Sequence, residues 1–507
     1  MDCLVSKRNV NKIILTAINA KWIHPSLALR LLKANLGDLE NTCKIVEFAL
    51  RQPLAEKVDA LLAESPSILG ISVSIWNHSA TIELLEALEN VWITRPVIVF
   101  GGPEVSHLHK DAKIFKYADY VIRGEGENAF RLLCETLTSS RSSLETQEII
   151  QKTETQFINA PPVDLNQIKS AYHLYTDEDI EKKLIYVEAS RGCPFACDFC
   201  LSAVDVQTEF DNPADTKQEK VREFPLDAFL KEMDVLIKRG VKTFKFLDRT
   251  FNANTGRENE VYALRIINFF LEKMNEYKTS FVVHFEMIAQ TEFVHLKKPN
   301  GLNESELMKA LARFPPGTLR LEIGIQTLNK DVAARIHRPS NPQKEMEVLQ
   351  FLREKTNAVI HADLIAGLPG EDLASFAEGF DRLWQALSDN NETEKRAGVE
   401  IQLGILKQLP GTPISRHNEK WGMRFNRQPP YEIEETSSIS AEEIQRIKNF
   451  ARFWEIIVNR GLKDMHASLD TPKNQSIFWD FMALSDSLLS RFGKNWGIDK
   501  NKLLEAI

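Results

Sequence analysis

Cysteine is scarce in this sequence, with 6 residues among 507, yet three of the six fall within eight positions. A chain so poor in cysteine does not build a disulfide scaffold, which indicates reduced thiols and a cytoplasmic protein. The first 20 residues lack the apolar core and the cleavage site of a signal peptide. No apolar run approaches the length that spans a bilayer, so we expect no membrane association.

An excess of positive charge is also missing. The formal net charge is -8, which argues against a nucleic-acid partner recruited by a basic surface. The hydrophobic content of 43% and the charged content of 26% are typical of globular proteins. A chain of 507 residues is long for one domain, so we expect more than one.

The first region, residues 1–137, alternates short apolar runs with amphipathic stretches. This pattern predicts a parallel sheet that helices cover on both faces. Ligands of such sheets bind beyond the carboxyl ends of the strands, where this region places glycines and small polar residues. The predicted strands are 12–18, 43–49, 67–74, 96–102 and 120–124.

Three further regions follow. Residues 138–182 are predicted to form a linker and a crossing segment, because the stretch is first polar and then carries paired prolines. Residues 183–413 again alternate strands and helices, and six such units predict a partial (β/α)6 barrel. Residues 414–507 are predicted to form a small, mostly helical domain. The predicted barrel strands are 184–190, 242–248, 281–287, 319–325, 359–365 and 399–405.

The cysteine cluster, "CPFACDFC", directly follows the first of these barrel strands. The chemistry of such barrels lies at the carboxyl ends of the strands, which is where Cys193, Cys197 and Cys200 are expected. Three thiolates can bind one soft metal centre, whereas a structural zinc site normally takes four ligands. A four-iron cluster with one open iron fits three thiolates, and a zinc site or a chance pattern remains the alternative.

The cluster resembles the C-x-x-x-C-x-aromatic-C motif of radical S-adenosylmethionine (SAM) enzymes, with Phe199 as the aromatic residue. "EIGIQTLNKDVAARIHR", "HADLIAGLPGED" and "GILKQLPGT" resemble the fourth-, fifth- and sixth-strand segments of that family. The first region, with "GGPEVS" and "GEGEN", resembles the cobalamin-binding domain of the B12-dependent branch, and the last region resembles an uncharacterised appended domain. The resemblance implies an α/β protein: a doubly wound, Rossmann-like cobalamin-binding domain, a partial TIM-like barrel and a helical C-terminal domain.

The resemblance also implies three cofactors. Cys193, Cys197 and Cys200 would hold three irons of a [4Fe–4S] cluster, and SAM would chelate the fourth iron. An electron, delivered by a flavodoxin or a ferredoxin, would cleave SAM to methionine and a 5′-deoxyadenosyl radical. The third cofactor is cobalamin, and the implied substrate is a small molecule.

The SAM contacts are placed by comparison with the family. A Gly-Gly-Glu-like segment normally follows the second strand, but "FLDRTFNAN" stands there and offers Asp248, Arg249 and Asn252. Asp248 and Arg249 could instead form an ion pair at the end of the strand. A glutamate facing inward from a strand is costly to bury unpaired, which favours a role in the site. The further candidates are Glu322, Gln326, Arg338 and Phe199.

Cobalamin is expected at the ends of the third and fourth strands. Many cobalamin domains carry a D-x-H-x-x-G motif whose histidine binds cobalt. "INAKWIHPSLALR" has His24, but Trp22 and Leu27 stand where the motif has Asp and Gly. A ligating imidazole usually needs an acceptor that orients its ring, so we predict that no protein histidine binds cobalt. The residues expected along the cobalamin tail are Ser72, Ser74, Gly101, Gly102 and Glu104.

Two classes of function fit this sequence. In the first, the protein is a radical SAM enzyme that uses cobalamin to methylate an unactivated carbon, or alternatively to rearrange or contract a ring. In the second, it is a non-catalytic binding protein that responds to cobalamin or to redox state. The enzyme is favoured, because an open iron beside SAM-like motifs has little use in a sensor. Cleavage of SAM by the reduced protein distinguishes the two classes.

Overall fold

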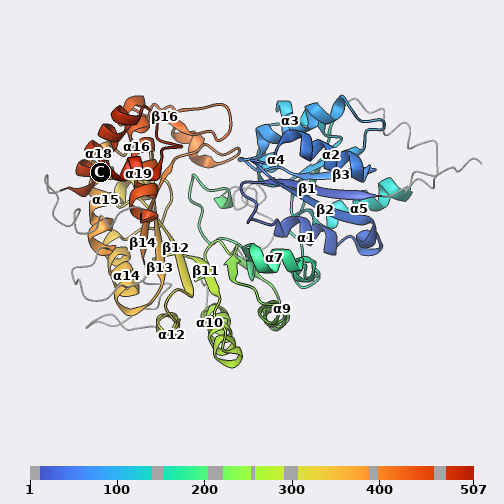
Figure 1. The fold of residues 1–507 in the computed structure, drawn as a ribbon, viewed down its shortest axis with the longest axis horizontal. Coiled ribbons are helices and arrows are strands. Elements are labelled where there is room, and N and C mark those ends of the chain that lie inside the picture. Colours follow the sequence, from blue (N-terminus) through green and yellow to red (C-terminus); the bar gives the residue numbers. More distant parts are fainter. Residues whose placement is uncertain are drawn as a thin grey trace, which may run out of the picture. The chain divides into compact units, whose positions relative to one another are not determined.

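The computed structural model describes residues 12–139, 154–203, 221–252, 257–289, 306–387, 398–461 and 476–507 (Figure 1). The chain forms two compact units. One comprises Met1–Val187 with Glu223–Phe244, and the other comprises Glu188–Arg222 with Lys245–Ile507. The predicted division into four regions, with boundaries at residues 137, 182 and 413, stays a prediction.

The first unit contains a six-stranded parallel sheet in the order β2-β1-β3-β4-β5-β6. Successive residues of β1 alternate between two apolar clusters, so the sheet is buried on both faces. The five predicted strands are confirmed, and β6 is added to them. The strands are β1 (Ile13–Asn19), β2 (Cys43–Ala49), β3 (Ile68–Ser72), β4 (Val97–Gly101), β5 (Tyr120–Gly124) and β6 (Gln156–Ala160).

Helices cover both faces of this sheet, as a doubly wound fold requires. Leu61 of α2 and Leu84 of α3 join one apolar cluster, whereas Leu29 of α1 and Phe130 of α5 join the other. Figure 1 shows these two helix pairs on opposite sides of the sheet. The helices are α1 (Leu27–Ala34), α2 (Leu54–Glu64), α3 (His78–Glu89), α4 (Pro103–His107) and α5 (Gly126–Ser139), with 3₁₀ turns η1 (Gly37–Thr42) and η2 (Lys113–Tyr117).

The sixth strand lies in the predicted crossing segment and was not expected as part of the sheet. Gln156–Ala160 pairs in parallel with Tyr120–Gly124. The paired prolines that follow, Pro161 and Pro162, exclude a helix but allow a strand to end just before them. The segment continues through η4 (Tyr172–Leu174) and α7 (Asp177–Lys182). Asp179 anchors α7 to α1, because its Oδ2 accepts a 2.8 Å hydrogen bond from Nη2 of the buried Arg30.

The second sheet has six strands in the order β14-β13-β12-β11-β10-β7, so neighbours in the sheet are also successive strands of that sheet along the chain. Its registered pairs, from β11 to β14, are parallel. The predicted partial barrel is confirmed, and each of its six predicted strands is present. The strands are β7 (Ile185–Val187), β10 (Thr243–Phe246), β11 (Val282–Met287), β12 (Leu319–Gln326), β13 (Val359–Ala366) and β14 (Val399–Ile405).

Amphipathic helices alternate with these strands. Alternate residues of β11 and β12 are buried and apolar, and the more accessible positions between them carry most of the polar side chains of these strands. A small two-stranded ribbon pairs β8 (Ser190–Gly192) with β9 (Val221–Glu223). The helices are α9 (Leu226–Lys238), α10 (Arg257–Tyr277), α12 (Glu306–Leu311), α13 (Lys330–Arg335), α14 (Pro342–Lys355) and α15 (Leu373–Leu387).

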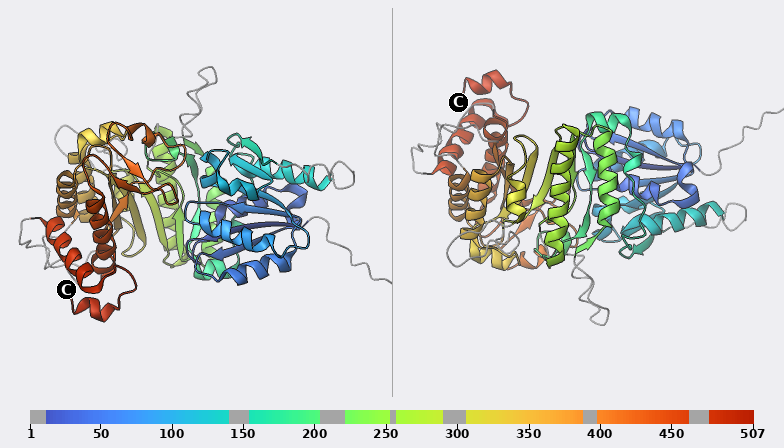
Figure 2. Two further views of the ribbon diagram at one scale, coloured as in Figure 1. Left: turned by 90° about the horizontal axis from the view of Figure 1, so that it is seen from above. Right: turned by 90° about the horizontal axis from the view of Figure 1, so that it is seen from below.

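The C-terminal region is mostly helical, as predicted. Its helices lie together at one end of the second unit, coloured red in Figure 2. Phe450 of α16 stacks on Phe478 of α18 with 4.9 Å between ring centroids, and Trp454 packs against Phe380 of α15. The elements are η5 (Pro413–His417), β15 (Arg424–Phe425), β16 (Ile433–Glu435), α16 (Ala441–Trp454), the π-helical η6 (Glu455–Asn459), α18 (Ile477–Phe492) and α19 (Lys500–Leu504). Within the described ranges, we find no helix with the length and apolarity needed to cross a membrane.

Candidate active site

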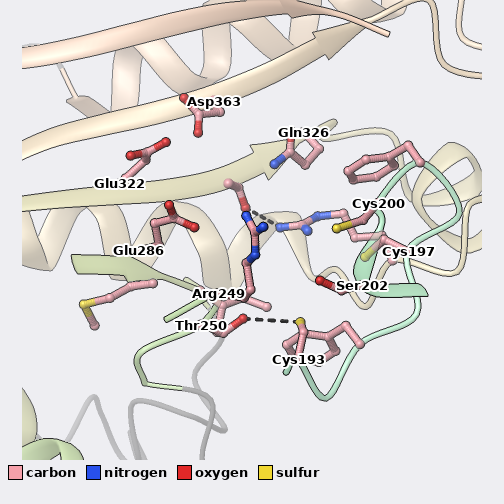
Figure 3. Close-up of a pocket in the computed structure, with 16 residues that line it drawn as sticks. Cys193, Cys197, Cys200, Ser202, Arg249, Thr250, Glu286, Glu322, Gln326 and Asp363 are labelled. Carbon is pink, nitrogen blue, oxygen red and sulfur yellow. Dashed lines mark hydrogen bonds between the residues drawn. The ribbon is translucent and has the colours of Figure 1, made fainter. Parts of the chain in front are cut away.

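The three clustered cysteines line one pocket of the second unit (Figure 3). They lie on the loop that follows β8, and a 2.9 Å hydrogen bond from Cys200 N to Cys197 O turns this loop. The pocket also takes in the ends of β11, β12 and β13, so the predicted position of the thiols at the carboxyl ends of the barrel strands holds. Its lining comprises Cys193, Phe195, Cys197, Phe199, Cys200, Ser202, Arg249, Thr250, Glu286, Met287, Ile288, Glu322, Gly324, Gln326, Arg338 and Asp363.

The environment of the thiols suits a soft metal centre. Burial raises the pKa of Cys197 to about 11, against the opposing charge of Arg338, and burial also raises the pKa of Cys193. Both side chains are therefore protonated at neutral pH and would release protons on binding iron. Across the residues that the structure describes, no three His, Cys, Asp or Glu side chains converge on the position of a single ion. Three thiolates fit a four-iron cluster with one open iron, whereas a structural zinc site normally takes four ligands.

The end of β12 carries a distortion that aims Gln326 into the pocket. The register with β13 shifts between Gly324 and Gln326, and Gln326 has a positive φ of 70°. A Cβ atom at Gly324 would lie 2.4 Å from Nε2 of Gln326, so a larger residue there would displace this amide from its position. The Oε1 atom of Gln326 is buried without a hydrogen-bond partner. A bulge that redirects an unpartnered amide into a pocket is typical of a ligand site.

Arg338 lies beside the thiols in a fixed orientation. Its Nε donates a 3.1 Å hydrogen bond to the carbonyl of Ile325, and its Nη2 donates to the carbonyl of Gly324. The end of β12 thus holds the guanidinium, which lines the pocket near Cys197. A guanidinium held in this way can pair with the carboxylate of a ligand.

Three carboxyl groups face the pocket from neighbouring strands: Glu286 on β11, Glu322 on β12 and Asp363 on β13 (Figure 3). The pKa of Glu322 is lowered to about 2, first by its contact with His284, 3.2 Å away, and also by Lys245. Burial, reinforced by the charge of Glu322, raises the pKa of Glu286 to about 7 and that of Asp363 to about 8. At neutral pH Glu322 is therefore ionised, Asp363 is mostly protonated, and Glu286 is close to its midpoint.

The inner face of the barrel is polar beyond the pocket. The ring of His284 stacks on His361 with 5.7 Å between centroids. Nδ1 of His361 lies 3.1 Å from Oε2 of Glu400 and 3.2 Å from Nε2 of Gln402, and its Nε2 is buried without a partner. Branched apolar side chains fill the interior of a packed barrel. This polar lining instead indicates an interior that receives a ligand.

The structure brings most of the candidate SAM contacts together in this pocket. Phe199, Arg249, Glu322, Gln326 and Arg338 line it. Two further candidates, Asp248 and Asn252, are not part of the lining. Asp248 accepts hydrogen bonds from Ala189 N and Ser190 Oγ. Asn252 makes two 2.9 Å hydrogen bonds with the backbone of Ile288, one as donor and one as acceptor. The SAM-binding roles of all seven stay predictions.

Sequence reasoning missed two lining carboxyl groups, Glu286 and Asp363. A signal for them was present in the sequence. Each is a charged residue at an alternate position of an otherwise apolar strand, in "FVVHFEM" and "VIHADLI". The same alternation directed attention to Glu322, and applying it to every barrel strand would have found all three.

A second candidate site lies at the carboxyl edge of the first sheet. Ser72 and Gly101 end β3 and β4, and the loops that follow carry Ser74, Gly102 and Glu104. Gly102 has a φ of 104°, and a Cβ atom there would lie 2.6 Å from the carbonyl oxygen of Val73. The two loops therefore approach each other as closely as only glycine allows.

Two further side chains shape this edge. Asn77 is fully buried, accepts a 2.8 Å hydrogen bond from Ser74 N and donates to the carbonyls of Ile18 and Ser72. Nδ1 of His78 lies 2.9 Å from Oε1 of the buried Glu104. Sequence reasoning missed both residues.

Exposed aromatic side chains complete the edge of the first sheet. Trp22 follows β1 and is 46% exposed, and Trp76 follows β3 and is 51% exposed. Large apolar side chains beside closely packed glycine loops fit a broad macrocycle such as a corrin. His24 lies in the loop after β1, and its Nδ1 is 2.8 Å from the hydroxyl of Tyr186.

Comparison with known families agrees with both sites. Residues 187–383 match the model of the radical SAM superfamily, and residues 13–134 match the B12 binding domain. The chain contains a radical SAM domain and a B12-binding domain. Residues 419–470 match a family described only as a protein of unknown function, in line with the uncharacterised C-terminal region expected from the sequence.

The curated relatives of this chain are distant. It is 22% identical over 391 residues to the cobalamin-dependent radical SAM methyltransferase TokK of Streptomyces tokunonensis, an alignment that covers 73% of this chain and 51% of TokK. It is 24% identical to a 2-(S-pantetheinyl)-carbapenam-3-carboxylate methyltransferase of Streptantibioticus cattleyicolor, over 69% of this chain and 48% of that protein. The chain thus spans about half the length of these curated relatives.

Solved structures share its fold. The apo form of the cobalamin-dependent S-adenosylmethionine radical enzyme OxsB aligns with 98% of this chain and 74% of its own, at a TM-score of 0.61 and 17% identity. The radical SAM methyltransferase TsrM from Kitasatospora setae, with tryptophan and a SAM analogue bound, aligns with 80% of this chain and 75% of its own, at a TM-score of 0.56 and 16% identity. The predicted family and fold class are confirmed.

The predicted cofactors are confirmed at the level of the two domains. The radical SAM domain implies a [4Fe–4S] cluster and SAM, and the B12-binding domain implies cobalamin. The residues of this chain fit these groups, because three thiols share a pocket with an unpartnered amide and a fixed guanidinium. The particular contacts to each cofactor stay predictions.

Proposed function

We propose that this chain is a cobalamin-dependent radical SAM enzyme that methylates an unactivated carbon of a small molecule. The observation that carries the proposal is the pocket that Cys193, Cys197 and Cys200 line together with Gln326 and Arg338. When bound, the cluster supplies the electron that cleaves SAM, and cobalamin carries the methyl group.

The chain's own residues bind and orient these groups. The three cysteines would hold three irons of the cluster. Arg338, fixed by two carbonyls of β12, would pair with the SAM carboxylate, and Oε1 of Gln326 would accept a hydrogen bond from SAM. The protonated Asp363 can donate a hydrogen bond at neutral pH, which an ionised aspartate cannot do. Phe199 helps to enclose the pocket, and excluding water protects a reactive radical.

The polar barrel interior supports a hydrophilic substrate. Lys245, His284, His361 and Glu400 line the inner face with both donors and acceptors. A purely apolar substrate would leave the buried Nε2 of His361 and Oδ1 of Asp363 without a partner, at a cost of about 1–3 kcal/mol for each. We therefore place the methyl acceptor among polar small molecules rather than lipids.

The test begins with the full chain, reconstituted without oxygen with iron, sulfide and cobalamin. The loaded protein is reduced with dithionite in the presence of trideuteromethyl SAM, and the products are analysed by mass spectrometry. We expect 5′-deoxyadenosine and S-adenosylhomocysteine, even without substrate. Cys200→Ala should abolish the formation of 5′-deoxyadenosine. Cys134→Ala is the control and should not, because Cys134 lies in the apolar core of the first sheet.

The outcomes separate the functions that the sequence left open. A loaded, reduced protein that releases no 5′-deoxyadenosine, even with cell extract as a source of substrates, would point to a binding protein and overturn the proposal. Formation of 5′-deoxyadenosine with a product that lacks the deuterated methyl group would favour a rearrangement or a ring contraction instead. A product that carries the deuterated methyl group would identify the substrate.

A further inference from the structure

A hydroxyl group lies against one of the three clustered cysteines. Oγ1 of Thr250 is 3.5 Å from Sγ of Cys193, and both side chains line the pocket of the three thiols (Figure 3). In the free thiol, either of these two atoms can donate the hydrogen bond. A thiolate that binds a metal has no proton, so Thr250 must then be the donor.

The residues that follow Thr250 fix the turn to which it belongs, after β10. Phe251 N donates a 2.8 Å hydrogen bond to the carbonyl of Glu286. Asn252 is fully buried, and its side chain makes two hydrogen bonds with the backbone of Ile288. The end of β11 therefore holds the turn, which limits how far the hydroxyl can move from its position.

The same turn is tied to the segment that leads to Cys193. Asp248, two residues before Thr250, is 2% exposed, and its carboxylate accepts a 3.0 Å hydrogen bond from Ala189 N and a 2.6 Å hydrogen bond from Ser190 Oγ. Ser190 begins β8, which ends one residue before Cys193. The hydroxyl and the sulfur thus belong to two segments that are already connected, so the donor is in place before any metal binds.

A hydrogen bond to a sulfur ligand affects the reduction potential of an iron–sulfur cluster. Reduction adds negative charge, and the cysteine sulfurs carry part of it. A donor to sulfur therefore stabilises the reduced state more than the oxidised state, because hydrogen bonds strengthen with the charge of the acceptor. A threonine hydroxyl has this effect without adding a charge to the pocket.

We propose that Thr250 acts on the cluster through Cys193: its hydroxyl donates a hydrogen bond to the thiolate and raises the reduction potential. This inference rests on the proposed function in one respect, which is that Cys193 holds an iron. The redox step is balanced, because the cluster gains one electron that an external reductant loses, and the threonine keeps its proton.

A SAM atom is the competing acceptor for this hydroxyl. Thr250 stands in "FLDRTFNAN", the segment from which the family resemblance implies SAM contacts. Threonine has a single hydroxyl proton, so it cannot be donated fully to SAM and to Cys193 at the same time. Measuring the potential without SAM, and the affinity for SAM separately, distinguishes the two acceptors.

The experiment removes the hydroxyl while keeping the shape of the side chain. Thr250→Val replaces the hydroxyl by a methyl group, whereas Thr250→Ser keeps it. Thr138→Val is the matched control, because Thr138 is also partly buried and donates a 2.8 Å hydrogen bond to the backbone carbonyl of Cys134, which is not one of the clustered cysteines. The full-length proteins are reconstituted with iron and sulfide without oxygen and titrated with titanium(III) citrate in the absence of SAM. Electron paramagnetic resonance measures the reduced cluster, and calorimetry measures SAM binding to the unreduced proteins.

We expect Thr250→Val to make the equilibrium constant for reduction about 3- to 10-fold less favourable, which is a fall of about 28–59 mV for one electron. Thr250→Ser and Thr138→Val should keep the wild-type potential. Iron content and SAM affinity should be the same in all these proteins. If valine lowers the iron content, Thr250→Ala replaces it in the comparison, since alanine also lacks the hydroxyl and adds no volume.

Several results would overturn the inference. An unchanged potential in the variants without the hydroxyl would do so, and so would an equal fall in Thr250→Ser, which would assign the effect to packing. A weaker affinity for SAM with an unchanged potential would assign the hydroxyl to SAM instead. In the wild-type protein, the iron–thiolate stretching bands of the resonance Raman spectrum should shift in D₂O, and bands that do not shift would also contradict the proposal. Failure of the proposed function would look different, since Thr250→Val would still lower the potential while the reduced, loaded wild-type protein released no 5′-deoxyadenosine.

Discussion

Asp198 accepts a 2.7 Å hydrogen bond from Nε2 of His417, a residue 219 positions later in the chain. The backbone supports the same connection, because Ile414 N donates to the carbonyl of Asp198 at 2.9 Å. The loop that carries the cysteines is thus held from outside by η5, the turn that follows the last barrel strand. A carboxylate buried to this degree is stable only while its partners remain.

The first prediction concerns this anchor. Asp198→Ala would leave His417 and Arg416 without their common acceptor and free the cysteine loop. We expect a loss of about 2–4 kcal/mol in the free energy of unfolding, and less iron bound after reconstitution. Urea denaturation and iron analysis provide the measurements. Asp111→Ala removes an aspartate that is 77% exposed and should change neither quantity, so equal effects in the two variants would contradict the prediction.

Much of this architecture could be predicted from the sequence, because the patterns that indicate it lie within short stretches of the chain. Eleven strands were recognised from short apolar runs, and the thiol pocket from three cysteines within eight residues. The sixth strand of the first sheet was missed because Gln156–Ala160 is weakly apolar and stands before two prolines. The pairing of Asp198 with His417 could not be predicted, since it depends on how segments 219 positions apart fold together.

The second prediction concerns Arg338. Arg338→Lys keeps the positive charge but cannot reproduce the planar, backbone-held fork that faces the pocket. If this guanidinium pairs with the SAM carboxylate, the dissociation constant of SAM should rise about 10- to 100-fold in the reconstituted protein. Calorimetric titration measures it, with the exposed Arg427→Lys as the matched control. An unchanged affinity in Arg338→Lys would remove Arg338 from the SAM site.

The third prediction uses the raised pKa of Glu286. This carboxyl group titrates near pH 7 in the folded protein, because burial disfavours its charged form, and near pH 4.5 when exposed. Between these values the folded state holds a proton that the unfolded state has lost. The contribution of Glu286 to stability is therefore greatest at low pH and falls as the pH rises from about 4.5 to about 7.

Glu286→Gln removes this dependence. The melting temperature of the variant, minus that of the wild type, should increase as the pH is raised from 5.5 to 7.5. The measurement uses protein without cofactors, so that no ligand alters the titration. Glu505→Gln, at an exposed position, should show a constant difference over the same range. A constant difference for Glu286→Gln as well would mean that Glu286 titrates normally.

The last prediction concerns the lower face of cobalamin. His24 follows β1, but its Nδ1 lies 2.8 Å from the hydroxyl of Tyr186, and Tyr186 is not the carboxylate that usually orients a ligating imidazole. We therefore expect cobalamin bound without a protein histidine on cobalt. Electron paramagnetic resonance of the cobalt(II) form should show no nitrogen superhyperfine splitting from the protein, and His24→Ala should leave the spectrum unchanged.

His78→Ala tests the other histidine at this edge, since the contact of His78 with Glu104 is the kind that orients a ligating imidazole. Splitting that disappears in either variant would identify that histidine as a cobalt ligand and refute the prediction.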